Sequence, residues 1–377
     1  MAIQLFTPTF AVDECLAEIR ECLEKGWTGL GFKTVQFEEA WKKYTGMPHA
    51  HYLNSATAGL ELAFSILKDV HGWADGDAVI TTPLTFVSSN HAILLANLHA
   101  EFADVDDTLC LDPQSIRTHI TDKTRAVLFV GFGGNIGHYD EVVQICKEHH
   151  LALVLDAAHM AGTRVNGEIP GKEADAVIYS FQAVKNLPTA DSGMICFRDE
   201  KCDEIARKVA WLGINKDTYA RTNSMGNYKW KYDVEYVGHK DHGNSIMAAI
   251  GLVQLRYLDK DNAYRRQLAE WYTEGFRDYP DKIRLVEVPE SCESSRHLFQ
   301  IIVDDRDGLM NALHAADVYP GVHYVENTQY RMYAYAAGTC PKASYISDHV
   351  LSLPMHMRLT YEDVQHIIQT VVKYVQK

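Results

Sequence analysis

The chain has 377 residues, of which 47% are hydrophobic and 23% are charged, as in soluble globular proteins large enough for about two domains. Its formal net charge of −14 at pH 7 argues against a surface that binds nucleic acid or an anionic membrane. No uncharged apolar run approaches the roughly 18 residues that span a bilayer, and the first residues lack the basic segment of a signal peptide, so we expect a cytoplasmic protein.

The eight cysteines are scattered along the chain, and several lie in apolar runs. No two of them have the spacing of metal ligands. We therefore expect reduced, buried thiols and no metal site.

The first predicted element is an amphipathic helix over residues 12–25, which ends at Gly26. Apolar residues form a stripe along one face of this helix, and charged residues lie between them in the sequence. The stripe consists of Val12, Leu16, Ile19 and Leu23. A glycine-rich turn follows at residues 27–31, and a short helix begins near residue 37.

From residue 50 to about residue 200, short apolar runs alternate with helical patterns. The runs predicted as strands are 51–53, 78–80, 98–105, 126–130, 151–155, 176–179 and 194–197. This alternation favours an α/β fold with a largely parallel sheet and helices on both of its faces. In such sheets the active site lies at the carboxyl ends of the strands.

The pattern changes in the second half of the chain. Residues 199–211 and 244–258 are predicted helices, and the polar, turn-rich segment 213–243 between them, with Gly226, Gly238 and Gly243, is of a length that is usually functional or interfacial. Beyond about residue 270, short strands and helices predict a smaller α+β unit. We therefore expect a large domain over residues 1–260 and a small C-terminal domain over residues 261–377.

Lys185 lies in the connection between the strands predicted at 176–179 and 194–197, and so at an edge of the sheet. A lysine in a partly apolar pocket loses its proton more easily than one in water. The neutral amine is a nucleophile that can form a Schiff base with a carbonyl or with pyridoxal phosphate. A solvated loop lysine is the alternative that this residue alone leaves open.

Other strand ends carry side chains that fit the same cofactor. Pyridoxal phosphate needs a lysine, a carboxylate at its pyridine nitrogen, a phosphate cradle, a polar group beside its ring hydroxyl and an aromatic ring to stack on. Taken in that order, the chain offers Lys185, Asp156, the Ser55-Ala56-Thr57 helix start with Ser180, His159 and Phe86. Each residue alone has a simpler reading, such as a helix cap for Asp156. Their joint occurrence predicts a site for pyridoxal 5′-phosphate.

The segments 156–159 and 180–187 resemble the DegT/DnrJ/StrS family of nucleotide-sugar aminotransferases, and so do 54–60, 83–87, 248–251 and 297–299. The resemblance covers nearly the whole chain. It implies the aspartate-aminotransferase fold, with a mostly parallel mixed sheet, and a homodimer with active sites at the subunit interface. It also implies transfer of an amino group from L-glutamate to the keto carbon of a nucleotide-linked sugar. Such reactions make amino sugars for surface polysaccharide, such as lipopolysaccharide O-antigen, or for glycosylated metabolites.

The resemblance also implies roles for individual residues. Lys185 would bind the cofactor covalently, Asp156 would pair with the pyridine nitrogen, and His159 would stand beside the ring hydroxyl. Phe86 would stack on the ring, while Ser180 and the turn 55–57 would hold the phosphate. Thr28 and Gly29 match a turn near the sugar, and His323 and Tyr324 match part of the sugar pocket.

Two segments depart from the family pattern. In 238–244, Lys240 stands where the family usually has Asn and is expected to reach the phosphate site of a partner subunit, while Asp241 has no counterpart there. After Tyr324 the usual Pro and second His are missing, and residues 326–328 stand instead. The nucleotide (dTDP, UDP or GDP) stays open, with C4 of a 4-keto-6-deoxy sugar preferred over C3 as the commoner substrate type.

Three other functions are alternatives. A pyridoxal-phosphate-dependent sugar dehydratase or lyase is the main alternative, although dehydratases of this family carry His where this chain has Lys185. A regulatory relative would need an added basic DNA-binding domain, for which charge and length leave no room. A nicotinamide enzyme is disfavoured because the glycines in 131–135 lack the dinucleotide-binding spacing.

Overall fold

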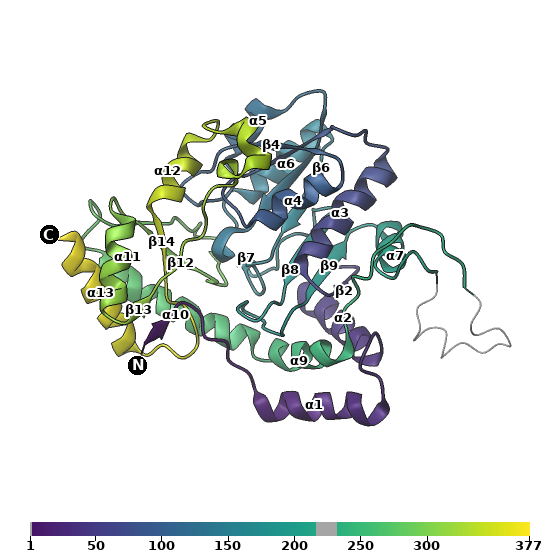
Figure 1. The fold of residues 1–377 in the computed structure, drawn as a ribbon, viewed down its shortest axis with the longest axis horizontal. Coiled ribbons are helices and arrows are strands. Elements are labelled where there is room, and N and C mark those ends of the chain that lie inside the picture. The colour runs from purple at the N-terminus through teal and green to yellow at the C-terminus, as the bar shows by residue number, and fades with distance from the viewer. Residues whose placement is uncertain (1, 216–231) are drawn as a thin grey trace.

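The computed structural model of the protein describes residues 2–215 and 232–377. At its centre is a seven-stranded sheet with the order β2-β9-β8-β6-β5-β3-β4 (Figure 1). The strands are β2 His51–Leu53, β3 Ala78–Thr81, β4 His99–Phe102, β5 Thr124–Val130, β6 Ala152–Asp156, β8 Ala176–Ser180 and β9 Gly193–Phe197. Neighbouring strands run parallel except β9, which is antiparallel to β2 and β8. The predicted α/β class with a mostly parallel, mixed sheet is confirmed.

The central strands β6 and β8 are buried along their whole length. Such strands consist of near-continuous apolar runs, which is why the sequence pattern located them. Their register pairs Val130 with Asp156 and Asp156 with Ile178. The carboxyl ends of β5, β6 and β8 therefore lie level at one edge of the sheet.

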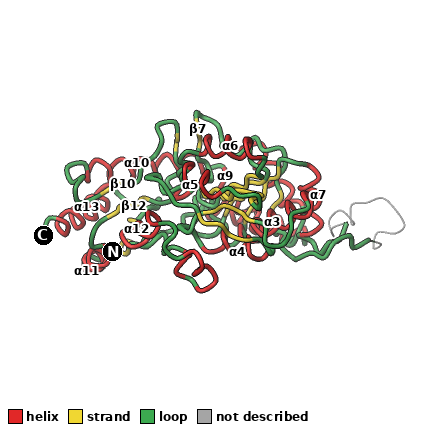
Figure 2. The backbone as a smooth tube through the Cα atoms, turned by 90° about the horizontal axis from the view of Figure 1, so that it is seen from above, coloured by secondary structure: helices red, strands yellow, loops and turns green. Residues whose placement is uncertain are grey.

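Helices cover both faces of this sheet, with α3 and α4 on one side and α6 on the other (Figure 2). The described α-helices that end before residue 258 are α1 Val12–Lys25, α2 Phe32–Thr45, α3 Ala56–His71, α4 Val87–Leu95, α5 Pro113–His119, α6 Tyr139–His149, α7 Glu200–Val209 and α9 Ser245–Leu255. Helix α3 begins where the Ser55 side chain accepts a hydrogen bond from Ala58 N, and it ends at Gly72 in the left-handed conformation.

The C-terminal part builds a second sheet, with the order β10-β12-β14, and a second buried cluster of its own. Its strands are β10 Arg284–Leu285, β12 Phe299–Ile302 and β14 Val350–Leu353, and its helices are α10 Leu258–Phe276, α11 Arg306–Ala315, α12 Pro341–His349 and α13 Tyr361–Val375. The structure also has two short two-stranded sheets, which are β1 Ile3–Gln4 with β13 Val318–Tyr319 and β7 Arg164–Val165 with β11 Cys292–Glu293. The domain boundary at residue 260 stays a prediction, and it falls inside α10.

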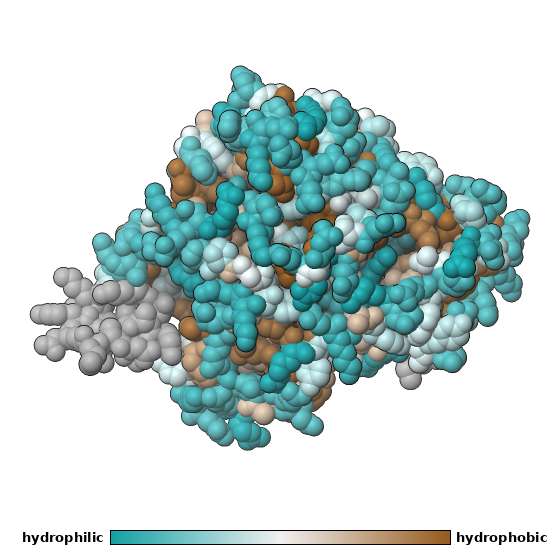
Figure 3. Space-filling model, turned by 180° about the vertical axis from the view of Figure 1, so that it is seen from behind, coloured by the Kyte–Doolittle hydropathy of each residue, from teal (hydrophilic) through white to brown (hydrophobic). Residues whose placement is uncertain are grey.

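The structure differs from expectation at the first helix. Helix α1 has the predicted bounds, but Val12, Leu16 and Leu23 of its apolar stripe are 56–62% exposed. Figure 3 shows apolar side chains gathered near the lower edge of the opposite face, in the region of α1 and α9. The amphipathic pattern was therefore right, but the described residues leave this stripe exposed.

Part of the turn-rich segment 213–243 lies outside the described residues, namely 216–231 with Gly226. All eight cysteines are free, and seven of them are buried. In the described ranges no helix has the length and apolar character to cross a membrane.

Candidate active site

Three strand ends meet at one cavity of about 430 Å³. Asp156 is the last residue of β6, Ser180 the last of β8, and Ser55 follows β2 at the start of α3. Ten of the residues predicted to hold a cofactor or substrate line this cavity: Ser55, Ala56, Thr57, Phe86, Asp156, His159, Ser180, Lys185, His323 and Tyr324. Residues far apart in sequence thus meet at the carboxyl ends of the strands, where the active sites of parallel sheets lie.

Lys185 lies in the turn after β8, where its backbone N–H donates to Gln182 O at 2.8 Å. Burial lowers the pKa of its amine from 10.5 to about 8, although the charge of Asp156 opposes that change. A much larger share of this lysine is therefore neutral near pH 7 than of a lysine in water. The site thus holds a nucleophilic amine that can also carry protons.

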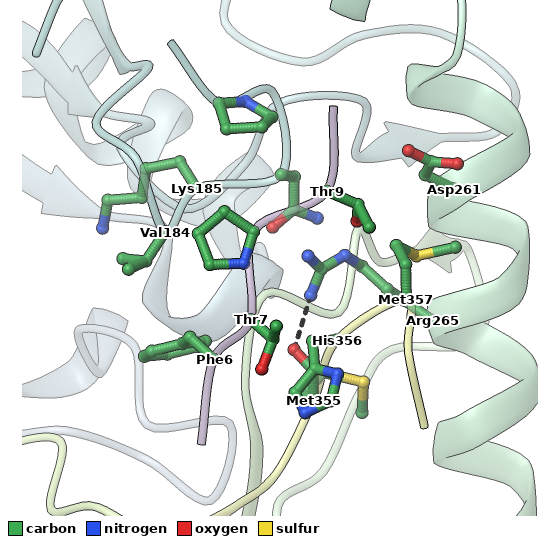
Figure 4. A pocket seen from close by; sticks show the side chains of 13 residues that line it. Phe6, Thr7, Thr9, Val184, Lys185, Asp261, Arg265, Met355, His356 and Met357 are labelled. Atoms are coloured by element: carbon green, nitrogen blue, oxygen red, sulfur yellow. Dashed lines mark hydrogen bonds between the residues drawn. The ribbon is translucent and has the colours of Figure 1, made fainter. Parts of the chain in front are cut away.

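The amine of Lys185 points away from a second, small pocket behind its turn (Figure 4). That pocket surrounds Arg265 of α10, whose guanidinium donates to Met355 O at 2.9 Å. Figure 4 also shows residues 6–9 of the N-terminal segment passing between Lys185 and α10. The reactive atom of Lys185 therefore belongs to the larger cavity at the strand ends.

Asp156 is held by two donors on its two oxygens. Ser89 Oγ donates to Oδ2 at 2.7 Å, and Ala158 N donates to Oδ1 at 3.0 Å. Burial raises the pKa of this carboxyl, and the bonds from Ser89 and Ala158 and the charge of Lys185 counteract the rise. A buried carboxylate of this kind is suited to hold a positively charged partner. Ser89 was not predicted from the sequence, where its place in the first turn of α4 was its only signal.

The start of α3 forms a cradle for an anion. The N–H groups of Ala56 and Thr57 are the first of the helix and have no acceptor among the described residues, because Ser55 Oγ takes Ala58 N instead. A Cβ atom on Gly193 would lie 2.5 Å from Ala56 N. Only glycine lets β9 approach the helix start this closely.

His159 is buried at 7% exposure, and burial together with nearby Lys185 holds its pKa well below 6.5. Its neutral ring accepts a hydrogen bond at Nδ1 from Gly133 N at 3.2 Å. The proton is therefore on Nε2, which lies 3.2 Å from the Tyr324 hydroxyl and donates to it. That bond leaves the O–H of Tyr324 to donate into the cavity.

Two more histidines line the cavity. His297 stacks on Phe6 and lies 4.4 Å from His159 between ring centroids. His323 Nδ1 lies 2.9 Å from Ser352 Oγ, and burial lowers its pKa to about 4. His297 had been assigned no role from sequence, since its place beside His159 depends on packing between distant segments. Near pH 7 all three rings are neutral, which keeps positive charge away from Lys185.

Phe86 precedes α4 and keeps 57% of its surface exposed at the cavity. Its ring lies 5.9 Å from that of Tyr324, at an angle of 49°. The pair forms an aromatic wall with an open face, so stacking of a planar ring on Phe86 stays a prediction that this exposure favours.

Three predicted residues do not line this cavity. The carbonyl groups of Thr28 and Gly29 accept from Ser245 N at the start of α9. The amine of Lys240 lies 5.7 Å from the centre of the Trp211 ring, while its carbonyl accepts from Asn54 Nδ2 at 3.3 Å. Lys240 thus runs beside the start of α3 without its amine entering the site, and the roles of these residues stay predictions.

The residues of the site fit pyridoxal phosphate. Unpartnered N–H groups suit its phosphate, a buried carboxylate suits a protonated ring nitrogen, and a lysine of lowered pKa suits its aldehyde. In the part of the chain that the structure describes, no group of three His, Cys, Asp or Glu side chains is placed to hold a metal ion.

The fold and the site together fit an enzyme that uses pyridoxal phosphate. The sequence pattern of the DegT/DnrJ/EryC1/StrS aminotransferase family matches residues 11–372. The chain belongs to this family, and the resemblance inferred from sequence is confirmed.

Relatives support this assignment over the full length. The spore coat polysaccharide biosynthesis protein SpsC of Bacillus subtilis is 32% identical over 95% of this chain and 93% of its own. The aminotransferase TlmJ of Streptoalloteichus hindustanus is 30% identical, with a TM-score of 0.90 over 100% of this chain and 99% of its own. Spr1654 of Streptococcus pneumoniae, solved in a PLP form, is 27% identical, with a TM-score of 0.90 over 100% and 99% of the two chains. It has also been solved in a PMP form, which indicates that the family depends on pyridoxal phosphate.

Proposed function

We propose that this protein transfers an amino group from L-glutamate to the keto carbon of a nucleotide-linked keto-deoxy sugar, with C4 preferred over C3. The reaction would serve amino-sugar biosynthesis in the cytoplasm, for a surface polysaccharide or a glycosylated metabolite. The observation that carries the proposal is the amine of Lys185, with its pKa lowered to about 8, in one cavity with Asp156 and the anion cradle of α3.

When bound, pyridoxal phosphate supplies an aldehyde that takes up an amino group and a ring that withdraws electrons. Lys185 Nζ would accept a proton from the α-carbon of the amino donor and pass it to the carbon that carried the cofactor's aldehyde. In the half-reaction with the sugar, it would move a proton back to the sugar carbon that is aminated. Asp156 would keep the ring nitrogen protonated, and Ala56 N and Thr57 N would hold the phosphate. The O–H of Tyr324, fixed by His159, would orient the ring from the cavity wall.

We further propose that the protein acts as a homodimer with shared active sites. The exposed side chains of Phe10, Val12, Leu16, Leu23 and Val35 form an apolar surface around α1. Covering such a surface favours association. Lys240 and the turn at Thr28 and Gly29 lie outside the cavity of their own chain. In a homodimer, they would line the active site of the other subunit.

The function is tested by incubating the protein with L-glutamate and 4-keto or 3-keto deoxy sugars linked to dTDP, UDP or GDP. We expect one 2-oxoglutarate per amino sugar with at least one of these acceptors, and NMR of the product identifies the aminated carbon. Loss of water from the sugar without 2-oxoglutarate would instead identify a dehydratase. If no acceptor gives either product, the proposed substrate class is wrong.

A further inference from the structure

A further cavity, separate from the pocket around Arg265, lies behind the active site and contains an unpaired arginine. Arg296 lies in the link between β11 and β12, in the left-handed backbone conformation with φ 48°. Its guanidinium has no hydrogen bond and no ion pair with any residue of 2–215 or 232–377. Burial lowers its pKa, and the charge of Arg266 adds to this effect. A charge in such surroundings calls for a counter-charge that the described chain does not supply.

The other arginines of this region have partners. Arg266 Nη2 lies 2.8 Å from Glu293 Oε1, and Arg277 pairs with Glu274. The lack of a partner at Arg296 is therefore a property of that position and not of the surface around it.

Arg296 borders two adjoining hollows that also share Thr273 and Ser294. The inner one has a volume of about 180 Å³, and the outer one, of about 390 Å³, lies along α10. Arg296 is the only charged residue of the inner cavity among the described residues. Its apolar lining consists of Phe132, Leu285, Val286, Val288, Leu298 and Phe299. A cavity of about 150 Å³ is enough for benzene.

The inner cavity shares a wall with the active site. Gly133, which lines it, donates from its N–H to His159 Nδ1 at 3.2 Å. Gln300, which also lines it, donates from Nε2 to His323 O at 3.2 Å. Two residues that line the inner cavity are therefore hydrogen-bonded directly to two residues of the active site.

We propose that this cavity binds a small monocarboxylate with an apolar body of about the size of a benzene ring. The planar guanidinium of Arg296 binds the carboxylate in a two-point contact, and the apolar lining covers the body. Arg296 is the one cation of the described chain that lines the inner cavity, and Arg266 and Arg277 of the outer hollow are paired with Glu293 and Glu274. One unneutralised positive charge matches one negative charge, which selects a carboxylate over a phosphate dianion. The outer hollow is the entrance.

Calorimetric titration of the holoenzyme with benzoate at constant ionic strength tests the proposal, with benzamide as its neutral counterpart. We expect benzoate to bind at least about tenfold more tightly than benzamide, because one charge-assisted contact is worth this much. Arg296→Gln should weaken benzoate binding at least about tenfold, Arg296→Lys should restore part of it, and the matched rim variant Arg277→Gln should leave it unchanged.

Three results would overturn the proposal: no benzoate binding, equal affinity for benzoate and benzamide, or benzoate binding that Arg296→Gln leaves unchanged. The last result would place benzoate in the catalytic cavity instead. Since the comparison of the two ligands uses the wild-type protein, the proposal can fail even if Arg296→Gln does not fold.

Discussion

The imidazole of His159 donates a hydrogen bond to the hydroxyl of Tyr324, at 3.2 Å and across 165 positions of sequence. The bond joins the end of the large sheet to the C-terminal part of the chain. The tautomer of His159 is fixed by Gly133 N, which donates to Nδ1 and leaves the proton on Nε2. Two residues predicted separately, one for the cofactor and one for the sugar, thus act as a unit.

Tyr324→Phe should lower kcat about tenfold, since His159 Nε2 loses its acceptor and the cavity loses a donor. Steady-state kinetics with glutamate and the best acceptor measures the effect. Tyr333→Phe is the matched control, because the Tyr333 hydroxyl lies 2.7 Å from His91 Nδ1 in a Tyr–His pair outside the cavity. Equal losses in the two variants would reduce the role of Tyr324 to structural support.

The pKa of Lys185 should govern the attachment of pyridoxal phosphate to the apo protein. Only the neutral amine attacks the aldehyde, so the rate should rise with pH and level off above about 8. Stopped-flow absorbance between pH 6 and pH 10 measures this profile. In Asp156→Asn the midpoint should move to lower pH, because the lost negative charge had stabilised the protonated amine. A rate that still rises at pH 10 without levelling off would mean that the lysine behaves as in water.

Asp156→Asn should also lower kcat by about 100-fold or more, because the amide cannot neutralise a charge on the ring nitrogen. The fold should be kept, since Asn can still accept from Ala158 N. Asp175→Asn is the control: Asp175 accepts from Leu153 N near the opposite end of the same strand and pairs with Arg198. Its loss should affect stability and leave the kinetics near wild type. Wild-type kinetics in Asp156→Asn would exclude the assigned role.

Leu16→Glu should weaken the proposed homodimer at least about tenfold, because it puts a charge on the apolar surface around α1. Sedimentation velocity at several concentrations measures the dissociation. The control Tyr361→Glu places the same charge on another exposed hydrophobic residue, at the start of α13, which lies apart from α1 at the left of Figure 1. A dimer that tolerates Leu16→Glu would need a different interface.

The site was predictable from sequence where it depends on strands. Buried parallel strands are continuous apolar runs, so the residues that follow them, such as Asp156 and Lys185, could be assigned to one edge of the sheet. His297 and Ser89 could not be found in this way, because packing between distant segments brings them to the cavity. The apolar stripe of α1 shows the opposite limit, since periodicity identifies an apolar face without identifying what covers it.

The central claim is that Lys185 is the residue that binds the cofactor. Borohydride reduction of the protein loaded with pyridoxal phosphate, followed by peptide mass spectrometry, tests it most directly. We predict one phosphopyridoxyl group per chain, on the peptide that contains Lys185, and no labelling of Lys185→Ala. A label on another lysine, or equal labelling of Lys185→Ala, would contradict the assignment.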